Sequence, residues 1–588
     1  NIVTRREHLE PGTPRRHVQS AMGMTESSFA AGGTLSQDHA FSLRGGSDVR
    51  SGGLDIDLGS AGPFLPGAFN RHATLNGNGR VVGTRTIVTG TARFFAEDAG
   101  VAHNPLLGLA VAPPAPSDSQ YERYHRVYGM RTDSTPGPQA LREYTVGGTA
   151  TFMQDLHWTH AITLGLDGYS LRGVPQDHGP IPSAASDSAF AAARGSADRG
   201  TLRLSSVGRF GDPDRAGATL TLAAEQSILR ENTAALAYGP LTSPALVAAD
   251  RTVLQWQQTS AAIAQAEGAL RNSLFLTAGL RAEQDAGLAA GTQRALLPVV
   301  GAALAREAGP FTIKFRAAYG RGIRPPQTAV RETMWTGIHA QVTSPDLAPE
   351  RQSGVEAGVD ILLGDVGSLQ LTRYSQTATG LIQWVGIPAT TSAAYGGHAD
   401  MFADSAGRRE QQTRIDYELE NLGAIANRGW EMQATANLAR LWLTGTLAYT
   451  DSRVQSTAGG YLGDLRPGDR VLGVPAWTGS LMASWNLRGW ASSLSAYRAY
   501  DWINYDRLGL AQASLAGRTH EAVGWNLRNY WKRYDGNTHL RASASRDIGR
   551  GLTFLVTGDN LLNKQLGEPD NTTVLPGRTI SLGVRAAF

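Results

Sequence analysis

The sequence predicts an all-β protein that crosses a membrane as one large antiparallel β-barrel. Apolar and polar residues alternate from Thr579 to the C-terminal Phe588. Because successive side chains of a strand point to opposite sides, this segment would have one apolar and one polar face. A soluble sandwich strand gives the same alternation. However, an aromatic residue at the outer end of the apolar face is typical of outer-membrane barrels, which have aromatic girdles. No apolar run approaches the ~20 residues of a membrane-spanning helix.

The composition fits a single large barrel better than several soluble domains. The 588 residues contain no composition shift, Pro-rich linker or charge block, and only 18% of them are charged. The net charge of +3 is too small to indicate a nucleic-acid partner, and the absence of cysteine excludes disulfides and thiol chemistry. Only three lysines occur, so the other 51 of the 54 basic residues are arginine. A GC-rich genome explains this bias, although arginine also suits capture of carboxylate or phosphate in a lumen.

Hairpin patterns run along the chain from its beginning. We expect strands over 17–24 and 28–35, with the polar segment 36–39 separating the latter from another strand at 40–44. Two further hairpins are expected near the C-terminus. They join 477–486 to 490–500 around 487–489, and 539–545 to 552–557 around 546–551.

Long polar stretches rich in Gly and Pro separate the hairpins. Loops longer than ~12–15 residues are uncommon in compact domains, and short turns alternating with long loops are typical of outer-membrane barrels with short periplasmic turns and long extracellular loops. A soluble propeller would instead show a repeat of about 40–50 residues, which we do not find. The stretches expected as loops are 46–80, 113–143, 168–200, 325–350, 386–414, 452–472 and 560–577.

Short motifs occur at both ends and throughout the C-terminal half of the chain. The first six residues are Asn-Ile-Val-Thr-Arg-Arg, and the later motifs lie at 315–326, 344–358, 420–431, 468–475 and 559–578. These segments resemble motifs of TonB-dependent outer-membrane receptors. The first is similar to the last strand of that family's plug, and the later ones resemble, in the family's order, "GFRAP", "NPDLKPERS", "ENVG…NRGVE", "G.RLPGVP" and "NLFNK…PGR". Glu350 and Arg351 of the second motif are expected to pair where a loop re-enters the barrel wall. The region from about 45 to 310 shares with the family only the general pattern of strands and loops and none of these motifs.

The resemblance implies the architecture and the function. Residues 1–6 would be the remnant of the last plug strand, and 7–588 a barrel of about 22 strands in a Gram-negative outer membrane. The family imports scarce, bulky nutrients such as ferric siderophores, cobalamin or haem, using energy supplied by a TonB-type partner, so we expect a transporter and not an enzyme. The other implied partners are the barrel assembly machinery, outer-membrane lipid and lipopolysaccharide; no cofactor is implied. The implied barrel-insertion signal is Ile580, Leu582, Val584 and Phe588.

Three groups of aromatic residues are interleaved with basic residues and could bind a flat, anionic metal chelate by stacking and charge-assisted hydrogen bonds. The alternative is the aromatic belt that anchors any barrel at the bilayer surface. The two interpretations are balanced for the first group, and we favour the belt for the third. The first group is Tyr121, Arg123, Tyr124, Arg126 and Tyr128; the second is Trp502, Tyr505 and Arg507; the third is Trp525, Tyr530, Trp531 and Tyr534.

Other functions find little support in the sequence. We find no nucleophile elbow, no zinc-protease motif and no phosphate loop. His157 and His160 are three residues apart, which places them on opposite faces of a strand, so no metal site is predicted there. A passive porin is the main alternative, but porins need only about 16–18 strands.

Overall fold

The computed structural model describes most of the strands and the shorter connections. The described residues are 15–30, 32–65, 67–100, 106, 138–173, 192–212, 214–236, 250–285, 294–324, 349–388, 415–461, 463–515, 518 and 524–588. The proposed plug remnant at residues 1–6 lies outside them, so that boundary stays a prediction.

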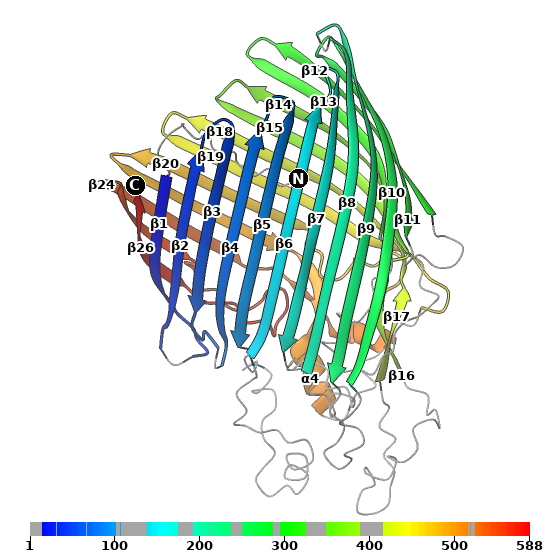
Figure 1. The fold of residues 1–588 in the computed structure, drawn as a ribbon. Helices are drawn as coiled ribbons and strands as arrows, with labels where there is room; N and C mark the ends of the chain where they lie inside the picture. Colours follow the sequence, from blue (N-terminus) through cyan, green and yellow to red (C-terminus); the bar gives the residue numbers. More distant parts are fainter. Residues whose placement is uncertain are drawn as a thin grey trace, which may run out of the picture.

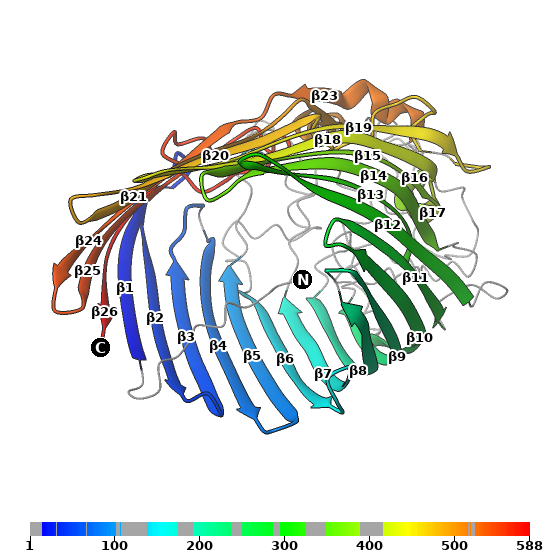
Figure 2. The same ribbon diagram turned by 90° about the horizontal axis from the view of Figure 1, so that it is seen from above.

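Twenty-two strands form one closed antiparallel barrel (Figures 1 and 2). Each strand pairs with its neighbours along the chain, and β1 pairs with both β2 and β26, which closes the sheet. The predicted fold is therefore confirmed. The strands are β1 (Arg15–Thr25), β2 (Thr34–Gly46), β3 (Arg50–Ala61), β4 (Phe69–Val82), β5 (Thr86–Gly100), β6 (Pro138–Met153), β7 (Trp158–Gly173), β8 (Ala192–Asp212), β9 (Ala216–Leu236), β10 (Asp250–Leu270), β11 (Leu274–Asp285), β12 (Arg294–Ala308), β13 (Phe311–Arg324), β14 (Glu350–Leu363), β15 (Gly367–Thr379), β18 (Gly423–Leu438), β19 (Leu441–Thr457), β20 (Trp477–Leu487), β21 (Trp490–Tyr500), β24 (Thr538–Gly549), β25 (Leu552–Asp559) and β26 (Thr579–Ala587).

In the described part of the connections, two small sheets and two short helices lie at one end of the barrel (Figure 1). Asp506 caps α4 by accepting a hydrogen bond of 2.9 Å from the Gly509 backbone N–H. Within the described residues, no helix has the length and apolar character needed to cross a bilayer. These elements are the sheet of β16 (Ile382–Pro388) and β17 (Ile415–Asn421), the sheet of β22 (Trp502–Tyr505) and β23 (Trp531–Tyr534), α4 (Arg507–Leu515) and the 3₁₀ helix η3 (Gly524–Tyr530).

The connections differ sharply between the two ends of the barrel. At one end every hairpin closes with two to four residues, as between β20 and β21. At the other end every connection has seven or more residues, and the longest lie between β15 and β18, β5 and β6, and β21 and β24. The first residue of β1 and the last of β26 are both at the short-turn end. This asymmetry is the one predicted from the sequence.

The barrel keeps its apolar side chains on the outside. Ile162, Leu164 and Leu166 of β7 are each about half exposed, whereas Thr163 and Asp167, at the alternate positions, face the lumen. A soluble protein would bury such residues, but here the surrounding bilayer is the apolar solvent. The apolar side chains therefore face lipid, and the polar side chains at the alternate positions face the water-filled lumen.

The closing strand follows the predicted alternation. Ile580, Leu582, Val584 and the terminal Phe588 are among the exposed large apolar residues. Phe588 exchanges two backbone hydrogen bonds with Arg16, of 2.9 and 3.0 Å, so the end of the chain is fixed to β1. The role of these residues as an insertion signal stays a prediction.

Two expectations about loops near the N-terminus were wrong. Residues 36–39 lie inside β2 instead of separating two strands, and the connection is at 26–33, where Gly32 has a φ of +87°. The segment 36–39 contains no Gly or Pro to turn the chain, and its polar side chains find cross-strand partners, as in the 2.9 Å contact between Ser20 Oγ and His39 Nδ1. Polarity alone therefore misidentified a strand as a turn.

The expected long loop at 46–80 consists mainly of β3 and β4. The error arises because one face of each strand lines a wet lumen, so polar and glycine residues are compatible with a strand there. Asp55 of β3 illustrates this, since it accepts two hydrogen bonds, of 3.0 and 3.1 Å, from Arg44 Nη2 on β2.

Candidate functional site

Three connections at the long-loop end are joined in series: 501–537 contacts 560–578 through Trp502 and Pro569, and it contacts 458–476 around a buried carboxylate, Asp464. Its Oδ2 accepts hydrogen bonds from the Tyr505 hydroxyl at 2.9 Å and from the Trp531 indole N–H at 2.7 Å. The neighbouring Leu465 is 3% exposed and packs with the buried Leu422 and Val454. We call the contacting parts of connections 458–476, 501–537 and 560–578 the loop cluster.

Arginines and tryptophans form a stack in this loop cluster. The Arg528 guanidinium lies 4.1 Å from the ring centre of Trp531 and 4.7 Å from that of Trp525, and Arg466 lies 4.8 Å from Trp525. Arg528 also forms two hydrogen bonds with the Asp469 carboxylate. Partial burial raises the pKa of Asp469, but the hydrogen bonds from Arg528 and from the Arg466 backbone outweigh it and hold that pKa below its ordinary value.

The structure places the second predicted ligand group inside the loop cluster. Trp502 is buried, donates a hydrogen bond of 2.9 Å to the Pro569 carbonyl and stacks on Tyr534. Tyr505 donates to Asp464, and Arg507 Nε lies 3.0 Å from Asp570 Oδ2. Only Arg507 of this group combines charge with substantial exposure. The proposed ligand role of the group stays a prediction.

The belt interpretation of the third group is wrong for Trp531 and Tyr534. Both belong to β23, outside the 22-stranded sheet, and Tyr534 is buried with its hydroxyl 2.8 Å from the Tyr505 carbonyl oxygen. The Trp531 indole binds Asp464 of another connection, and the Tyr534 hydroxyl binds the Tyr505 carbonyl within connection 501–537, so neither polar group is available to the bilayer interface. The first predicted group, 121–128, lies outside the described residues, so its ligand role also stays a prediction.

The buried tyrosines predict that the loop cluster opens in alkali. Burial, followed by the nearby Asp464, raises the pKa of Tyr505, and burial, followed by Asp506 and Asp570, raises the pKa of Tyr534 to about 12. Both phenols would titrate near 10 once exposed, so their contribution is fully present below pH 10; that of Tyr534 is lost as pH rises through about 12, and that of Tyr505 is lost as pH rises through its own raised pKa. We expect the tryptophan emission to shift to the red between these values while strand circular dichroism persists. A Tyr505→Phe/Tyr534→Phe variant should open at higher pH; an unchanged midpoint would contradict the assignment.

The lumen wall carries paired charges. Arg281 joins Glu283 at 2.7 Å and Glu225 at 3.2 Å, across β9–β11. A short way along the same wall, on β13–β15, Arg316 Nε donates to the buried Asp360 at 3.1 Å and its Nη2 donates to Thr372 at 2.5 Å. These pairs keep a polar interior that can contact a hydrophilic solute.

A luminal pocket of 350 Å³ opens between β14, β15, β18 and β19, with two valines of connection 458–476 in its wall. The Tyr374 side chain lies across Gly429, and its hydroxyl is 2.8 Å from Thr450 Oγ1. We did not predict this pocket; the polar residues at every second position of these strands were the available signal. It is lined by Glu356, Thr372, Tyr374, Gln376, Ile425, Asn427, Glu431, Thr450, Ser452, Val471 and Val474.

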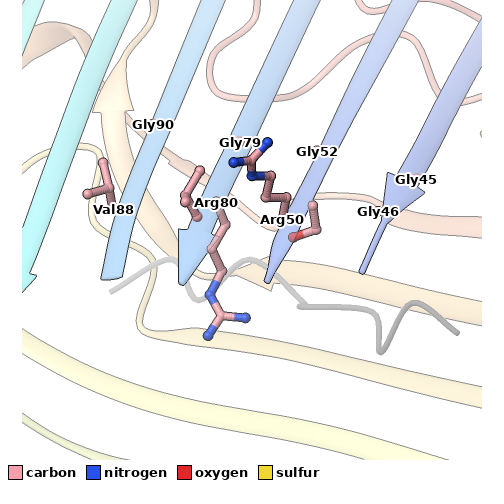
Figure 3. Close-up of a pocket in the computed structure, with 10 residues that line it drawn as sticks. Gly45, Gly46, Arg50, Gly52, Gly79, Arg80, Val88 and Gly90 are labelled. Atoms are coloured by element: carbon pink, nitrogen blue, oxygen red, sulfur yellow. The ribbon is translucent and has the colours of Figure 1, made fainter. Parts of the chain in front are cut away.

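A second depression, of 540 Å³, lies at the short-turn end of β2–β5 (Figure 3). It exists because glycines are paired directly across the strands, Gly45 with Gly52, Gly52 with Gly79, and Gly79 with Gly90. It is far along the strands from the long connections, and Arg50 and Arg80 are its only charged lining residues. We therefore place the candidate site at the opposite end.

The motif residue Glu350 binds a partner other than the expected Arg351. Glu350 begins β14 and accepts a hydrogen bond of 3.2 Å from Arg324, the last residue of β13, and another of 2.9 Å from the Ile382 backbone N–H. Arg324 and Glu350 are directly opposite in the sheet, whereas Arg351 points to the other face. Arg324 of the first later motif and Glu350 of the second thus link the two ends of the long connection between β13 and β14.

Histidine and carboxylate groups do not gather into a metal site in the described part of the chain. No cluster of three or more such residues is positioned to hold an ion there. His160 contacts Gln154 Oε1 at 2.8 Å, and His157 contacts the Arg209 carbonyl at 3.1 Å.

A family model described as "TonB dependent receptor-like, beta-barrel" matches residues 51–561. The chain belongs to this family. The match covers all the residues that line the luminal pocket and most of the loop cluster. A comparison with curated protein sequences found no match.

Solved siderophore receptors and a copper transporter share the fold at low sequence identity. The siderophore receptor PirA from Acinetobacter baumannii is 12% identical with a TM-score of 0.66, over 99% of this chain and 81% of that one. The ferric enterobactin receptor PfeA from Pseudomonas aeruginosa is 14% identical with a TM-score of 0.63, over 97% and 80%. The copper transporter OprC is 12% identical with a TM-score of 0.61, over 99% and 81%. Family and fold together identify an outer-membrane TonB-dependent transporter.

Proposed function

We propose that this TonB-dependent receptor imports a metal chelate, with a ferric siderophore as the first candidate and cobalamin or haem as the others. The observation that carries the proposal is the luminal pocket beneath long connections, in a barrel whose 22 strands match the size of plugged outer-membrane transporters. Three solved structures of the same fold are named as a siderophore receptor, a ferric enterobactin receptor and a copper transporter.

The arrangement of charges supports capture at the long-loop end followed by passage through the lumen. Arg507 and the Arg466–Trp525–Arg528 stack offer guanidinium and aromatic groups that suit an anionic, ring-bearing chelate. The polar lumen wall then replaces part of the hydration of the solute. The sequence group Tyr121, Arg123, Tyr124, Arg126 and Tyr128 has the same chemistry, and we propose it as a second contact.

The test is uptake by cells that express the full-length protein and lack their own receptors. Cells are supplied in turn with a radiolabelled ferric catecholate, ferric citrate, cobalamin and haem. We expect one of these to accumulate at least tenfold above vector-only cells, and accumulation to stop when the proton motive force is collapsed or the TonB-type transducer is deleted.

An Arg507→Ala variant should raise the concentration needed for half-maximal uptake, and Arg85→Ala, in the turn at the opposite end, serves as the control. Uptake that persists without the transducer would support a passive channel instead, although porins need only about 16–18 strands.

A further inference from the structure

The lumen wall has two chemically different sectors. Directly paired residues share a face of the sheet, so the lumen-facing positions can be followed around the barrel from Thr163 and Asp167 of β7. Every strand from β2 to β14 carries at least one lumen-facing acidic or basic residue, such as Arg44 on β2 and Arg316 on β13. In the described part of β15, β18, β19, β20 and β21, Glu431 is the single such residue. We call these the charged sector and the neutral sector.

Hydroxyl and amide side chains cover the neutral sector from the luminal pocket to the short-turn end. Thr372 and Glu431 of the pocket are directly paired and form one row of the wall. The two rows below them, toward the short turns, contain no charge. We call these two rows of directly paired residues the neutral strip: Gln370, Gln433, Thr446 and Ser480 in the first, and Ser368, Thr435, Thr444 and Met482 in the second.

The hydroxyl groups of the neutral strip bond to one another across the strands. Thr446 Oγ1 lies 2.7 Å from Ser480 Oγ, and Ser368 Oγ lies 2.7 Å from Thr435 Oγ1. A hydroxyl both donates and accepts, and its hydrogen rotates to suit the partner, so these groups can exchange their bonds for bonds to water or to a solute.

The charged sector makes stronger and more directional contacts. Arg44 pairs with Asp55 at 3.0 Å, and Arg199 pairs with Asp167 at 3.0 Å through two parallel hydrogen bonds. Charge-assisted hydrogen bonds of this kind are roughly twice as strong as those between neutral groups. The charged sector is therefore suited to holding the polar surface of the plug that closes a transporter barrel of this size.

A solute in transit needs contacts that it can form and then leave, because a site that binds too firmly stops passage. The neutral strip offers such contacts, and it begins where the luminal pocket ends. We propose that solute released from the luminal pocket travels to the short-turn end along the neutral strip, with the plug held against the charged sector. This path rests on the uptake function proposed above.

The absence of cysteine from the chain permits a direct labelling test in cells that express the full-length protein. Thr446→Cys and Ser480→Cys each place a thiol in the neutral strip. The controls, Thr149→Cys and Thr163→Cys, replace a matched hydroxyl pair of 3.1 Å on β6 and β7, across the lumen, where Thr163 is paired with Arg203 (Figure 2). We expect a water-soluble maleimide to label the strip positions at least tenfold faster, because the plug covers the controls.

Uptake by charged variants tests whether solute uses this path. Thr446→Asp/Ser480→Asp puts fixed charge in the neutral strip and should lower the maximal uptake rate at least tenfold. The concentration for half-maximal uptake should not change, because capture by the loop cluster comes first. Thr446→Asn/Ser480→Asn keeps neutral hydrogen-bonding groups and should retain most of the rate, and the matched Thr149→Asp/Thr163→Asp variant should stay within twofold of the natural protein. The mobility shift of unheated barrel in gels checks that each variant is folded.

Two results would overturn the path. One is equal labelling of the strip and control positions, and the other is an equal loss of uptake in the two double aspartate variants. If the natural protein accumulates none of the four solutes, the proposed uptake function fails, and the labelling comparison still decides whether the neutral strip is the open side of the lumen.

Discussion

Replacing Asp464 with alanine is expected to disorder the loop cluster while leaving the barrel intact. The Asp464 carboxylate accepts hydrogen bonds from both the Tyr505 hydroxyl and the Trp531 indole. The substitution would leave both part-buried donors without an acceptor, at a cost of about 1–3 kcal/mol each. We therefore expect local stability to fall by about 2–6 kcal/mol. Hydrogen exchange measured by mass spectrometry should show lost protection over 458–476 and 524–534.

Two control variants separate this effect from a general loss of charge. Asp464→Asn keeps a carbonyl oxygen that can accept both hydrogen bonds, so most of the protection should remain. Asp365→Ala removes an exposed carboxylate from the turn between β14 and β15, at the other end of the barrel, and should change nothing in the loop cluster. Equal protection in Asp464→Ala and the natural protein would mean that other contacts hold these loops.

The fold could be predicted because its decisive signals are local. Alternation across 579–588 follows from a wall with lipid on one side and water on the other, and it requires no knowledge of distant residues. The hairpin around Arg488 and Gly489 was predicted within one residue, since Gly489 supplies a φ of +81° for the turn. The strand number, by contrast, came from the family resemblance, because polar lumen-facing strands such as β3 and β4 resemble loops in sequence.

The candidate site could be predicted only in its residue types. The aromatic and arginine residues were recognised, but Trp502 and Tyr505 turned out to have their polar atoms bound by Pro569 and Asp464. Asp464 itself is an ordinary loop aspartate in sequence. Its importance depends on connections more than 40 residues apart meeting at one point, which periodicity does not encode.

The contact between Tyr374 and Gly429 predicts a second large effect, in the barrel wall. Tyr374 on β15 and Gly429 on β18 are directly paired, and the tyrosine side chain lies over the glycine to reach Thr450 on β19. A Cβ at position 429 would collide with the Tyr374 hydroxyl end and with the Tyr449 carbonyl oxygen. Gly429 therefore allows the Tyr374 side chain to link β15, β18 and β19 and to line the luminal pocket.

We expect Gly429→Ala to destabilise the barrel by about 1–3 kcal/mol, the usual range for overpacking, as measured by the urea midpoint in detergent micelles. Gly165→Ala is the matched control, because Gly165 also faces the lumen in mid-strand but has no atoms within 4 Å of the point where a Cβ would lie, so its midpoint should not fall. In a Tyr374→Ala background, Gly429→Ala should cost less, since the ring is gone and only the Tyr449 carbonyl still opposes the methyl group. If the cost were the same in both backgrounds, the backbone contact alone would account for it, and Tyr374 would not be the reason that this position requires glycine.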